Sequence, residues 1–360
     1  MTAAHEIISD DPALEEDELV VLARRCWEAD GGLPLAVEPW FVRGRWSRPD
    51  TRTFTIRTAD ATPGCSDVAA AGATLPDGAA LPQGAALPDG ADFPEGASLP
   101  DGAGQPNGAG LPAGVGRFSA AGRPGGGLLA AVGVRPGPQG PMITGMVDPA
   151  ARGYGAGSRL LDAALAVAGE SGGDVTVETE GLTKDAEDLF ESRGLRQFFA
   201  EHVMRIDLTA ALPREAGWPA RTAVTEWNAA TARRFFDVYA TSFRERPGFP
   251  DPSAEEWIGD TAEDDDFRPE WSLLATLPDS GDAGFVSVAE GWIQQVGVVP
   301  AARRTGLGGA LIREALRRMA AAGLREGWLC VNVDNPAASL YRRIGFQDVR
   351  RRARYRTAGS

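Results

Sequence analysis

A glycine-rich turn occurs twice in this chain of 360 residues, at a constant offset of 151 positions. Both copies contain the pattern Arg-x-x-Gly-x-Gly, first at residues 152–157 and again at residues 303–308. The same offset aligns further residues without a gap as far as Gly194 and Gly345. One register held over more than forty residues indicates an internal duplication, so we expect two copies of one fold.

Each copy of the turn lies between an expected strand and an expected helix. Segments 142–147 and 292–299 have the composition of strands, and segments 158–168 and 309–322 have helical apolar spacing. We expect further strands at 53–58, 128–134, 175–180, 272–277, 284–290 and 328–333, a strand pair within 198–208, and helices at 14–29, 185–192, 231–243 and 337–343. This alternation predicts the α/β fold class.

A hexapeptide repeat, Gly-Ala-x-Leu-Pro-x, contains part of the large glycine and proline content of 45 and 26 residues. Its prolines recur every six residues from Pro76 to Pro112. The proline of each hexad has no backbone N–H to donate to a neighbouring strand, and its glycine loses much conformational entropy on folding. An ordered solenoid is therefore disfavoured. We expect residues 72–116 to be a flexible insertion between two strands, 53–58 and 128–134, that pair as a hairpin.

Charge and rare residues exclude several function classes. The net charge of −14 disfavours binding to nucleic acid or to an anionic membrane. Three dispersed cysteines and two histidines do not form a disulfide framework, a metal site or a Ser-His-Asp triad, so no metal is expected. The acidic N-terminus resembles no secretory signal, and no 18-residue apolar run occurs. A cytoplasmic monomer or homodimer is therefore expected.

The turn has a clear physical use. Where a strand ends on glycines and a helix begins, several backbone N–H groups point at one spot with the helix dipole behind them. Glycine lets the backbone approach a bulky anion, so each turn is predicted to be a pyrophosphate cradle. It is not the dinucleotide fingerprint, because Ser158 and Leu311 occupy the positions of the third glycine.

Two motifs in the second half together resemble the GNAT superfamily of N-acetyltransferases. They are the acyl-CoA-binding turn that follows Val298 and the pattern Asn-x-x-Ala-x-Leu-Tyr-x-x-x-Gly-Phe, which begins at Asn335 and ends at Phe346. The first half resembles the same fold, so the resemblance implies two tandem GNAT folds, each a mixed, mostly antiparallel sheet with helices on both faces. The expected domains are 1–210, a linker at 211–221, and a catalytic domain at 222–360.

The resemblance also implies roles for residues of the second copy. Acetyl-CoA would be the co-substrate, with its pantetheine arm paired to the backbone of Val296 and Val298 and contacted by Asn335. Tyr341 would protonate the departing CoA thiolate. The pyrophosphate would be held by Arg303, Arg304, Thr305, Gly306, Leu307, Gly308 and Gly309. A tyrosine hydroxyl, with a pKa near 10, matches a thiol better than a carboxylic acid does.

The first copy departs from the family pattern. Phe190 stands where Tyr341 stands in the second copy, and Lys184 stands where Asn335 stands. Phenylalanine cannot donate a proton. We therefore expect the first half to be non-catalytic, with a possible CoA site formed by Arg152, Gly155 and Gly157.

The general base and the acceptor are less well marked. Glu290, at the end of an expected strand, is a candidate base, with a base acting through water as the alternative; Glu226 and Asp334 are weaker candidates. One of Gln294 and Gln295 is expected to face the substrate. Acidic runs at 255–256 and 263–266 could attract a cationic amine, and the basic tail 350–356 is expected to offset the acidic surface.

The sequence favours an N-acetyltransferase that moves an acetyl group to a primary amine of a small molecule by direct attack. A protein N-acetyltransferase, a mycothiol-synthase-like enzyme and a non-catalytic acyl-CoA sensor are the alternatives. Tyr341 and Asn335 argue against the sensor, since a sensor needs no proton donor.

Overall fold

A computed structural model describes residues 6–58, 127–209, 217–246 and 249–357. The expected hexapeptide insertion at 72–116 and residues 211–216 of the expected linker lie outside the described residues. The first half contains β1 (Ile7–Ser9), α1 (Glu16–Asp30), the 3₁₀ turn η1 (Pro34–Val37), α2 (Pro39–Trp46), β2 (Arg52–Arg57), β3 (Leu128–Arg135), β4 (Met142–Val147), η2 (Pro149–Ala151), α3 (Ala156–Glu170), β5 (Thr176–Thr179), α4 (Lys184–Ser192) and β6 (Leu195–Asp207). The second half contains β7 (Ala223–Glu226), α5 (Ala232–Phe243), α6 (Ala254–Glu263), β8 (Leu273–Leu277), β9 (Gly281–Ala289), β10 (Trp292–Val298), η3 (Pro300–Ala302), α7 (Leu307–Ala321), β11 (Glu326–Asn332), α8 (Ala338–Ile344) and β12 (Gln347–Thr357).

The duplication predicted from the sequence is confirmed in the backbone. Turn η2 and turn η3 have bounds that differ by the offset of 151, and so do helices α3 and α7. The strand before each turn and the short helix before each closing strand also correspond. The expected hairpin around the insertion is present, because β2 and β3 pair antiparallel. Helices α2 and α6 were not predicted.

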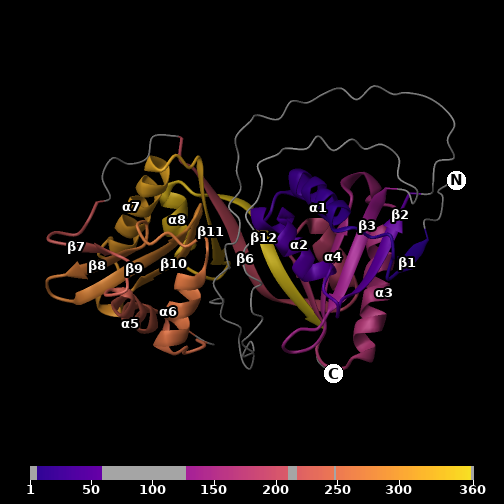
Figure 1. Cartoon of the computed structure of the whole chain (residues 1–360), viewed down its shortest axis with the longest axis horizontal. Coiled ribbons are helices and arrows are strands. Elements are labelled where there is room, and N and C mark those ends of the chain that lie inside the picture. Colours follow the sequence, from indigo (N-terminus) through magenta and orange to yellow (C-terminus); the bar gives the residue numbers. More distant parts are fainter. Residues whose placement is uncertain (1–5, 59–126, 210–216, 247–248, 358–360) are drawn as a thin grey trace.

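All strands of the described chain form one sheet, in the order β1-β2-β3-β4-β5-β12-β6-β11-β10-β9-β8-β7. β4 pairs with β5 and β10 pairs with β11 in parallel, and the other neighbouring pairs are antiparallel. The mixed α/β fold class is therefore confirmed. Figure 1 shows the two halves side by side, with helices on both faces of each.

The last strand of each half lies in the sheet of the other half. β6 of the first half pairs with β11 of the second half, and β12 at the C-terminal end pairs with β5 of the first half. β6 and β12 also pair with each other, so they join the strands of the two halves at the centre of the sheet (Figure 1). This exchange places side chains of one half against elements of the other.

Two predictions about these strands were wrong. Segment 198–208 is not a strand pair but part of the single long strand β6. The basic tail 350–356 is not a surface feature, because it forms most of the central strand β12. Arg354 is only 8% exposed, since it lies among buried carboxylates of the first half.

Separate apolar clusters hold the helices on the sheet. In the first half, α1 and α2 pack on the face of β3 that carries Leu128 and Ala131, and α3 packs on the face that carries Ala130 and Val132. In the second half, aromatic residues of α5 and α6 surround Phe285 of β9. Within the described residues no helix is long and apolar enough to cross a membrane.

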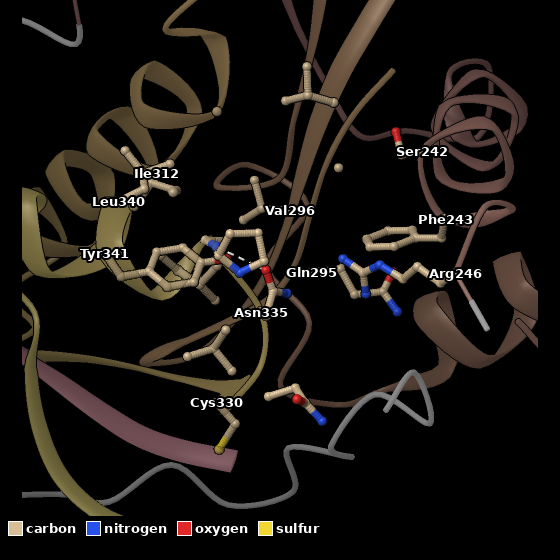
Figure 2. A pocket seen from close by; sticks show the side chains of 18 of the residues that line it. Ser242, Phe243, Arg246, Gln295, Val296, Ile312, Cys330, Asn335, Leu340 and Tyr341 are labelled. Atoms are coloured by element: carbon tan, nitrogen blue, oxygen red, sulfur yellow. Dashed lines mark hydrogen bonds between the residues drawn. The ribbon is translucent and has the colours of Figure 1, made fainter. Parts of the chain in front are cut away.

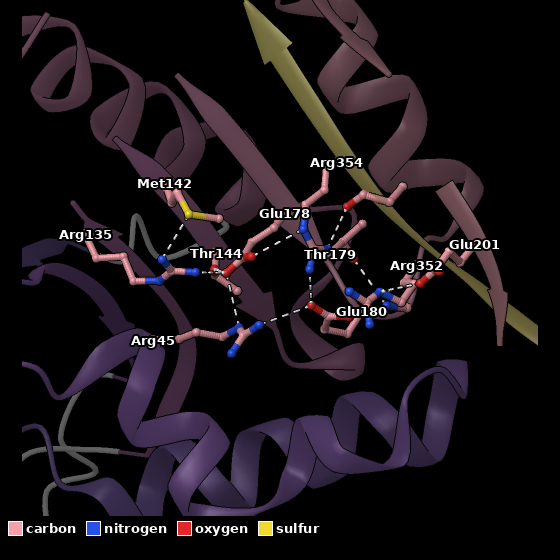
Figure 3. Close-up of polar contacts among 12 residues, drawn as sticks. Arg45, Arg135, Met142, Thr144, Glu178, Thr179, Glu180, Glu201, Arg352 and Arg354 are labelled. Carbon is pink, nitrogen blue, oxygen red and sulfur yellow. Dashed lines mark hydrogen bonds and ion pairs between the residues drawn. The ribbon is translucent and has the colours of Figure 1, made fainter. Parts of the chain in front are cut away.

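A buried ion network fills the α2 side of the first half. Glu178 of β5 lies 2.6 Å from Arg135 and 3.1 Å from Arg45, and it accepts a hydrogen bond of 2.5 Å from Thr144 (Figure 3). Arg354 of β12 lies 3.4 Å from the same carboxylate. Burial by itself raises the pKa of Glu178, but these guanidinium groups and the hydroxyl hold that pKa far below its ordinary value of 4.5.

Candidate active site

Strands β10 and β11 diverge directly after they meet. Their one register pair is Trp292 with Trp328, whose rings stack with centroids 6.0 Å apart. A bulge interrupts β10 between Ile293 and Gln295, which bends the strand away from its neighbour. Backbone groups beyond the tryptophans are therefore left without a strand partner on this side, and a gap opens between β10 and β11.

A cavity of about 1190 Å³ occupies this gap and the space beside it. It extends from the glycine-rich turn before α7 to α5, α8 and the exchanged strands β6 and β12. Its lining includes Phe198, Glu201, Tyr239, Ser242, Phe243, Glu245, Arg246, Phe249, Trp292, Gln294, Gln295, Val296, Gly297, Val298, Arg303, Arg304, Gly306, Leu307, Gly308, Gly309, Cys330, Asn332, Asp334, Asn335, Tyr341 and Arg352. One continuous site thus joins most of the predicted cofactor residues of the second half.

The turn before α7 has the geometry of an anion cradle. Gly306 has a φ of 90°, and the first helical bond is donated by the N–H of Ala310 to the carbonyl of Gly306, at 3.0 Å. The N–H groups of the preceding first turn of α7 have no helical acceptor and lie beside the cavity. Together with the helix dipole, they suit a pyrophosphate.

Two side chains of the turn have structural contacts. The Arg303 guanidinium donates to the carbonyl oxygens of Val298 and Ser242 and pairs with Glu245 at 3.0 Å. It thereby ties the end of α5 to the turn. The Thr305 hydroxyl donates to a carbonyl oxygen of the turn, at 2.8 Å, and Thr305 is the one residue of 303–309 that does not line the cavity.

Tyr341 and Asn335 both line the cavity. Figure 2 shows the Tyr341 ring extending toward Asn335 and Val296. Burial raises the pKa of Tyr341, and the nearby Arg246 opposes that shift. The hydroxyl therefore stays protonated at neutral pH, as a proton donor must. The Asn335 side-chain oxygen accepts from the N–H of Ala337 at 2.9 Å, which fixes its orientation at the start of α8.

The two glutamines on β10 have different environments. Gln294 donates a hydrogen bond of 2.8 Å to Asp264. The side-chain oxygen of Gln295 is buried without a hydrogen-bond partner among the described residues, and the residue lines the cavity between Val296 and Arg246 (Figure 2). Of the two glutamines, Gln295 is thus the one whose side-chain oxygen could accept a hydrogen bond from a ligand in the cavity.

Glu290 is not brought to this site. It lies at the turn between β9 and β10, forms an ion pair with Arg268, and does not line the cavity. The acidic run 263–266 lies nearby, and its member Asp266 is buried with a pKa raised to about 6 by desolvation and by Asp264. A hydrogen bond from Gln294 to Asp264 links this run to the cavity lining.

The corresponding elements of the first half keep the glycine-rich turn but differ in the strand gap and in the residues equivalent to Tyr341 and Asn335. β4 and β5 pair over three residues, and no bulge interrupts β4 where it pairs with β3. Phe190, in the position of Tyr341, packs in the core against Tyr355 with ring centroids 5.0 Å apart. Lys184 is exposed and pairs with Asp188 at 2.6 Å. The turn itself is retained, with Gly155 at a φ of 82° and Gly157 in the first turn of α3.

Comparison with known proteins agrees with this geometry. The model of the acetyltransferase (GNAT) family matches residues 238–346, the segment that contains the cradle and Tyr341. A mycothiol acetyltransferase of Clavibacter michiganensis subsp. michiganensis is 34% identical over 230 residues, which are 59% of this chain and 71% of that protein. This chain belongs to the GNAT family of acetyltransferases. The family comprises acetyl-CoA-dependent N-acetyltransferases.

A further relative agrees with this family, and two solved structures share the fold of both halves. A mycothiol acetyltransferase of Streptomyces scabiei is 31% identical over 217 residues, 56% of this chain and 66% of that protein. A GCN5-related N-acetyltransferase from Sphaerobacter thermophilus superposes with a TM-score of 0.63 at 21% identity, over 97% of this chain and 95% of that one. A tandem GNAT protein from the clavulanic acid biosynthesis pathway superposes with a TM-score of 0.55 at 15% identity, over 99% and 100%. The tandem GNAT fold is confirmed.

Several cavity residues were missed in the sequence. Ser242 comes from the end of α5 and Arg246 from the segment just beyond it, and Glu201 and Arg352 come from the exchanged strands. A lone glutamate in the apolar segment Phe-Phe-Ala-Glu-His-Val-Met was a visible signal for Glu201. A role for Glu201 could not be predicted from this signal, because that role depends on which strands lie beside Glu201 in the folded sheet.

Proposed function

We propose that the second half transfers the acetyl group of acetyl-CoA to a primary amine of a small molecule by direct attack. The supporting observation is that one cavity joins the N–H groups of the cradle, the gap between β10 and β11, and Tyr341. Acetyl-CoA supplies the activated acyl group. The chain supplies a cradle for its pyrophosphate at 303–309 and backbone groups of Val296 and Val298, on the strand that borders the gap, for its arm.

Each remaining group has a place in this reaction. Backbone donors of β10 polarise the acetyl carbonyl, and Asn335 contacts the cofactor arm. Tyr341 gives its proton to the sulfur when the C–S bond breaks. We further propose a division at the linker 211–221, with a first half that has no catalytic centre of its own around its glycine-rich turn, because Phe190 is a core residue without a hydroxyl.

A mycothiol-type acceptor is the second candidate, and the relatives named mycothiol acetyltransferase favour it. To distinguish acceptors, thiol release from acetyl-CoA is measured with kanamycin, spermidine, a cysteinyl sugar and a short peptide. Turnover with one of the first three supports the proposal, and preference for the cysteinyl sugar selects the second candidate. Turnover with the peptide alone indicates a protein acetyltransferase. CoA binding without turnover on any amine contradicts the proposal in favour of a sensor.

A further inference from the structure

Three carboxylates line the cavity within the described residues, and they differ in burial. Glu245 has a side chain that is 63% exposed and is paired with Arg303 at the cradle. Asp334 is exposed beside Asn335. The Glu201 side chain is only 13% exposed. Glu201 is thus the one of the three that meets the cavity from the protein interior.

Glu201 belongs to the first half but lies against the second. It is on β6, where its register partners are Asn332 of β11 and Arg352 of β12. Directly paired residues of antiparallel strands point to the same face of a sheet. All three residues line the cavity. The strand exchange therefore brings a carboxylate of the first half to the side of the gap that is opposite β10.

The guanidinium group of Arg352 beside Glu201 is shared with a second carboxylate, Glu180. The Arg352 Nε lies 3.4 Å from Glu201 and 3.3 Å from Glu180, and this nitrogen is buried without a hydrogen bond (Figure 3). Glu180 is also paired with Arg354 at 2.8 Å and Arg45 at 3.3 Å. Burial raises the pKa of Glu201, opposed by Arg352 and Arg354 and reinforced by Glu180. A further N–H donor in the cavity would therefore stabilise the ionised form of the Glu201 carboxylate.

We propose that Glu201 receives the amine of the acceptor, binding its ammonium group and taking a proton from it. This inference rests on the proposed acetyl transfer. The freed electron pair of the nitrogen forms the N–C bond, and the C–S bond breaks. Of the two protons that the nitrogen loses on becoming an amide, one passes to Glu201 and then to solvent. The other replaces the proton that Tyr341 gives to the sulfur.

The proposal gives the tandem arrangement a chemical role. The second half holds the cradle and the proton donor, while the first half supplies the acceptor-side carboxylate on β6. Its partner Arg352 comes from β12, which is anchored in the first half by β5. The site is then complete only when both halves are folded together.

The test uses CoA thioethers, so that it does not depend on the natural acceptor. The sulfur carries an alkyl chain of two to six carbons that ends in an ammonium group or in a methyl group. Binding to the full chain is measured by calorimetry. For at least one length, the ammonium probe should bind about tenfold more tightly than its methyl counterpart. In Glu201→Gln, which keeps the shape and loses the charge, this ratio should fall to about one.

Two further variants control the result. Glu326→Gln removes an exposed carboxylate of β11 that pairs with Arg205 at 2.9 Å. This variant should keep the wild-type ratio between the affinities of the ammonium and methyl probes. Glu201→Asp retracts the carboxylate by one methylene. The ammonium probe that binds most tightly to this variant should therefore have an alkyl chain one carbon longer than in the wild type. This variant provides the test if Glu201→Gln does not fold.

The proposal is overturned if the wild type shows no ammonium preference at any length. It is also overturned if Glu201→Gln keeps that preference. Should the methyl probes and CoA itself fail to bind the wild type, the proposed acetyl transfer is what fails. An unchanged affinity of Glu201→Gln for the methyl probes shows that the CoA site is intact.

Discussion

Arg152 holds Asp30 through two contacts of 2.6 and 2.7 Å, and this pair ties the end of α1 to the glycine-rich turn of the first half. In the second half Arg303 occupies the equivalent position and holds Glu245, just beyond α5. Each arginine also donates to the carbonyl of the last residue of the preceding strand. The arginines of the repeated motif are therefore fixed by protein contacts, and we propose that the backbone of the turn, and not these side chains, binds the anion.

Replacing these two arginines should separate the two halves functionally. Arg303→Gln should raise the KM for acetyl-CoA about fivefold, because the cradle loses its tie to α5. Arg152→Gln should lower stability by about 1–3 kcal/mol and leave kcat and this KM unchanged. Steady-state kinetics and urea unfolding measure both effects. A large fall in kcat for Arg152→Gln would show that the glycine-rich turn of the first half takes part in turnover.

Tyr341→Phe should reduce kcat about 100-fold, since the leaving sulfur loses its proton donor. The raised pKa of Tyr341 also predicts that the wild-type rate falls only at pH values above the ordinary tyrosine pKa of 10. The matched control is Tyr355→Phe, which removes a core hydroxyl 3.3 Å from Gln197 and should leave kcat unchanged. A pH–rate profile with the best amine of the panel checks both, and near-normal turnover by Tyr341→Phe would reject the assigned role.

Gly297→Ala should destabilise the fold, because the packing around β10 leaves no room for a methyl group. A methyl group there would lie 2.5 Å from a ring carbon of Phe285 and 3.0 Å from the Cβ of Ser242. Such overpacking costs about 1–3 kcal/mol. Gly259→Ala, in α6 with no atom within 4 Å of the new methyl group, should instead stabilise by about 0.5–1 kcal/mol. Urea denaturation distinguishes the two, and equal effects would contradict the packing at β10.

The buried network around Glu178 should make stability depend on pH. Its pKa is lower in the folded state than the ordinary 4.5, so its contribution is present above about 4.5 and is lost as pH falls toward the folded-state pKa. Glu178→Gln should cost about 3–5 kcal/mol at pH 7, because buried guanidinium groups lose their partner. Glu16→Gln, at a surface pair with Arg43, should change stability by less than about 1 kcal/mol. Unfolding free energies measured from pH 3 to 8 test this, and a flat profile for the wild type would refute it.

The sequence by itself determined the duplication, the two glycine-rich turns, and the positions of Tyr341 and Asn335. These features are local, because the spacing of glycines and apolar residues along one strand, turn and helix fixes their geometry. For this reason the predicted cradle at 303–309 lies at the cavity in all but Thr305. The contrast between Tyr341 and Phe190 was also visible, since a single offset aligns them.

Only the tertiary structure decided which strands lie side by side. The partners of β6 and β12 are distant in sequence, and a hydrophobic pattern specifies a buried strand without specifying its neighbour. That choice turned the basic tail into a central strand, placed Glu201 and Arg352 at the cavity, and left Glu290 outside it. A carboxylate acquires its chemistry from the groups around it, and here those groups come from strands that only the folded sheet brings together.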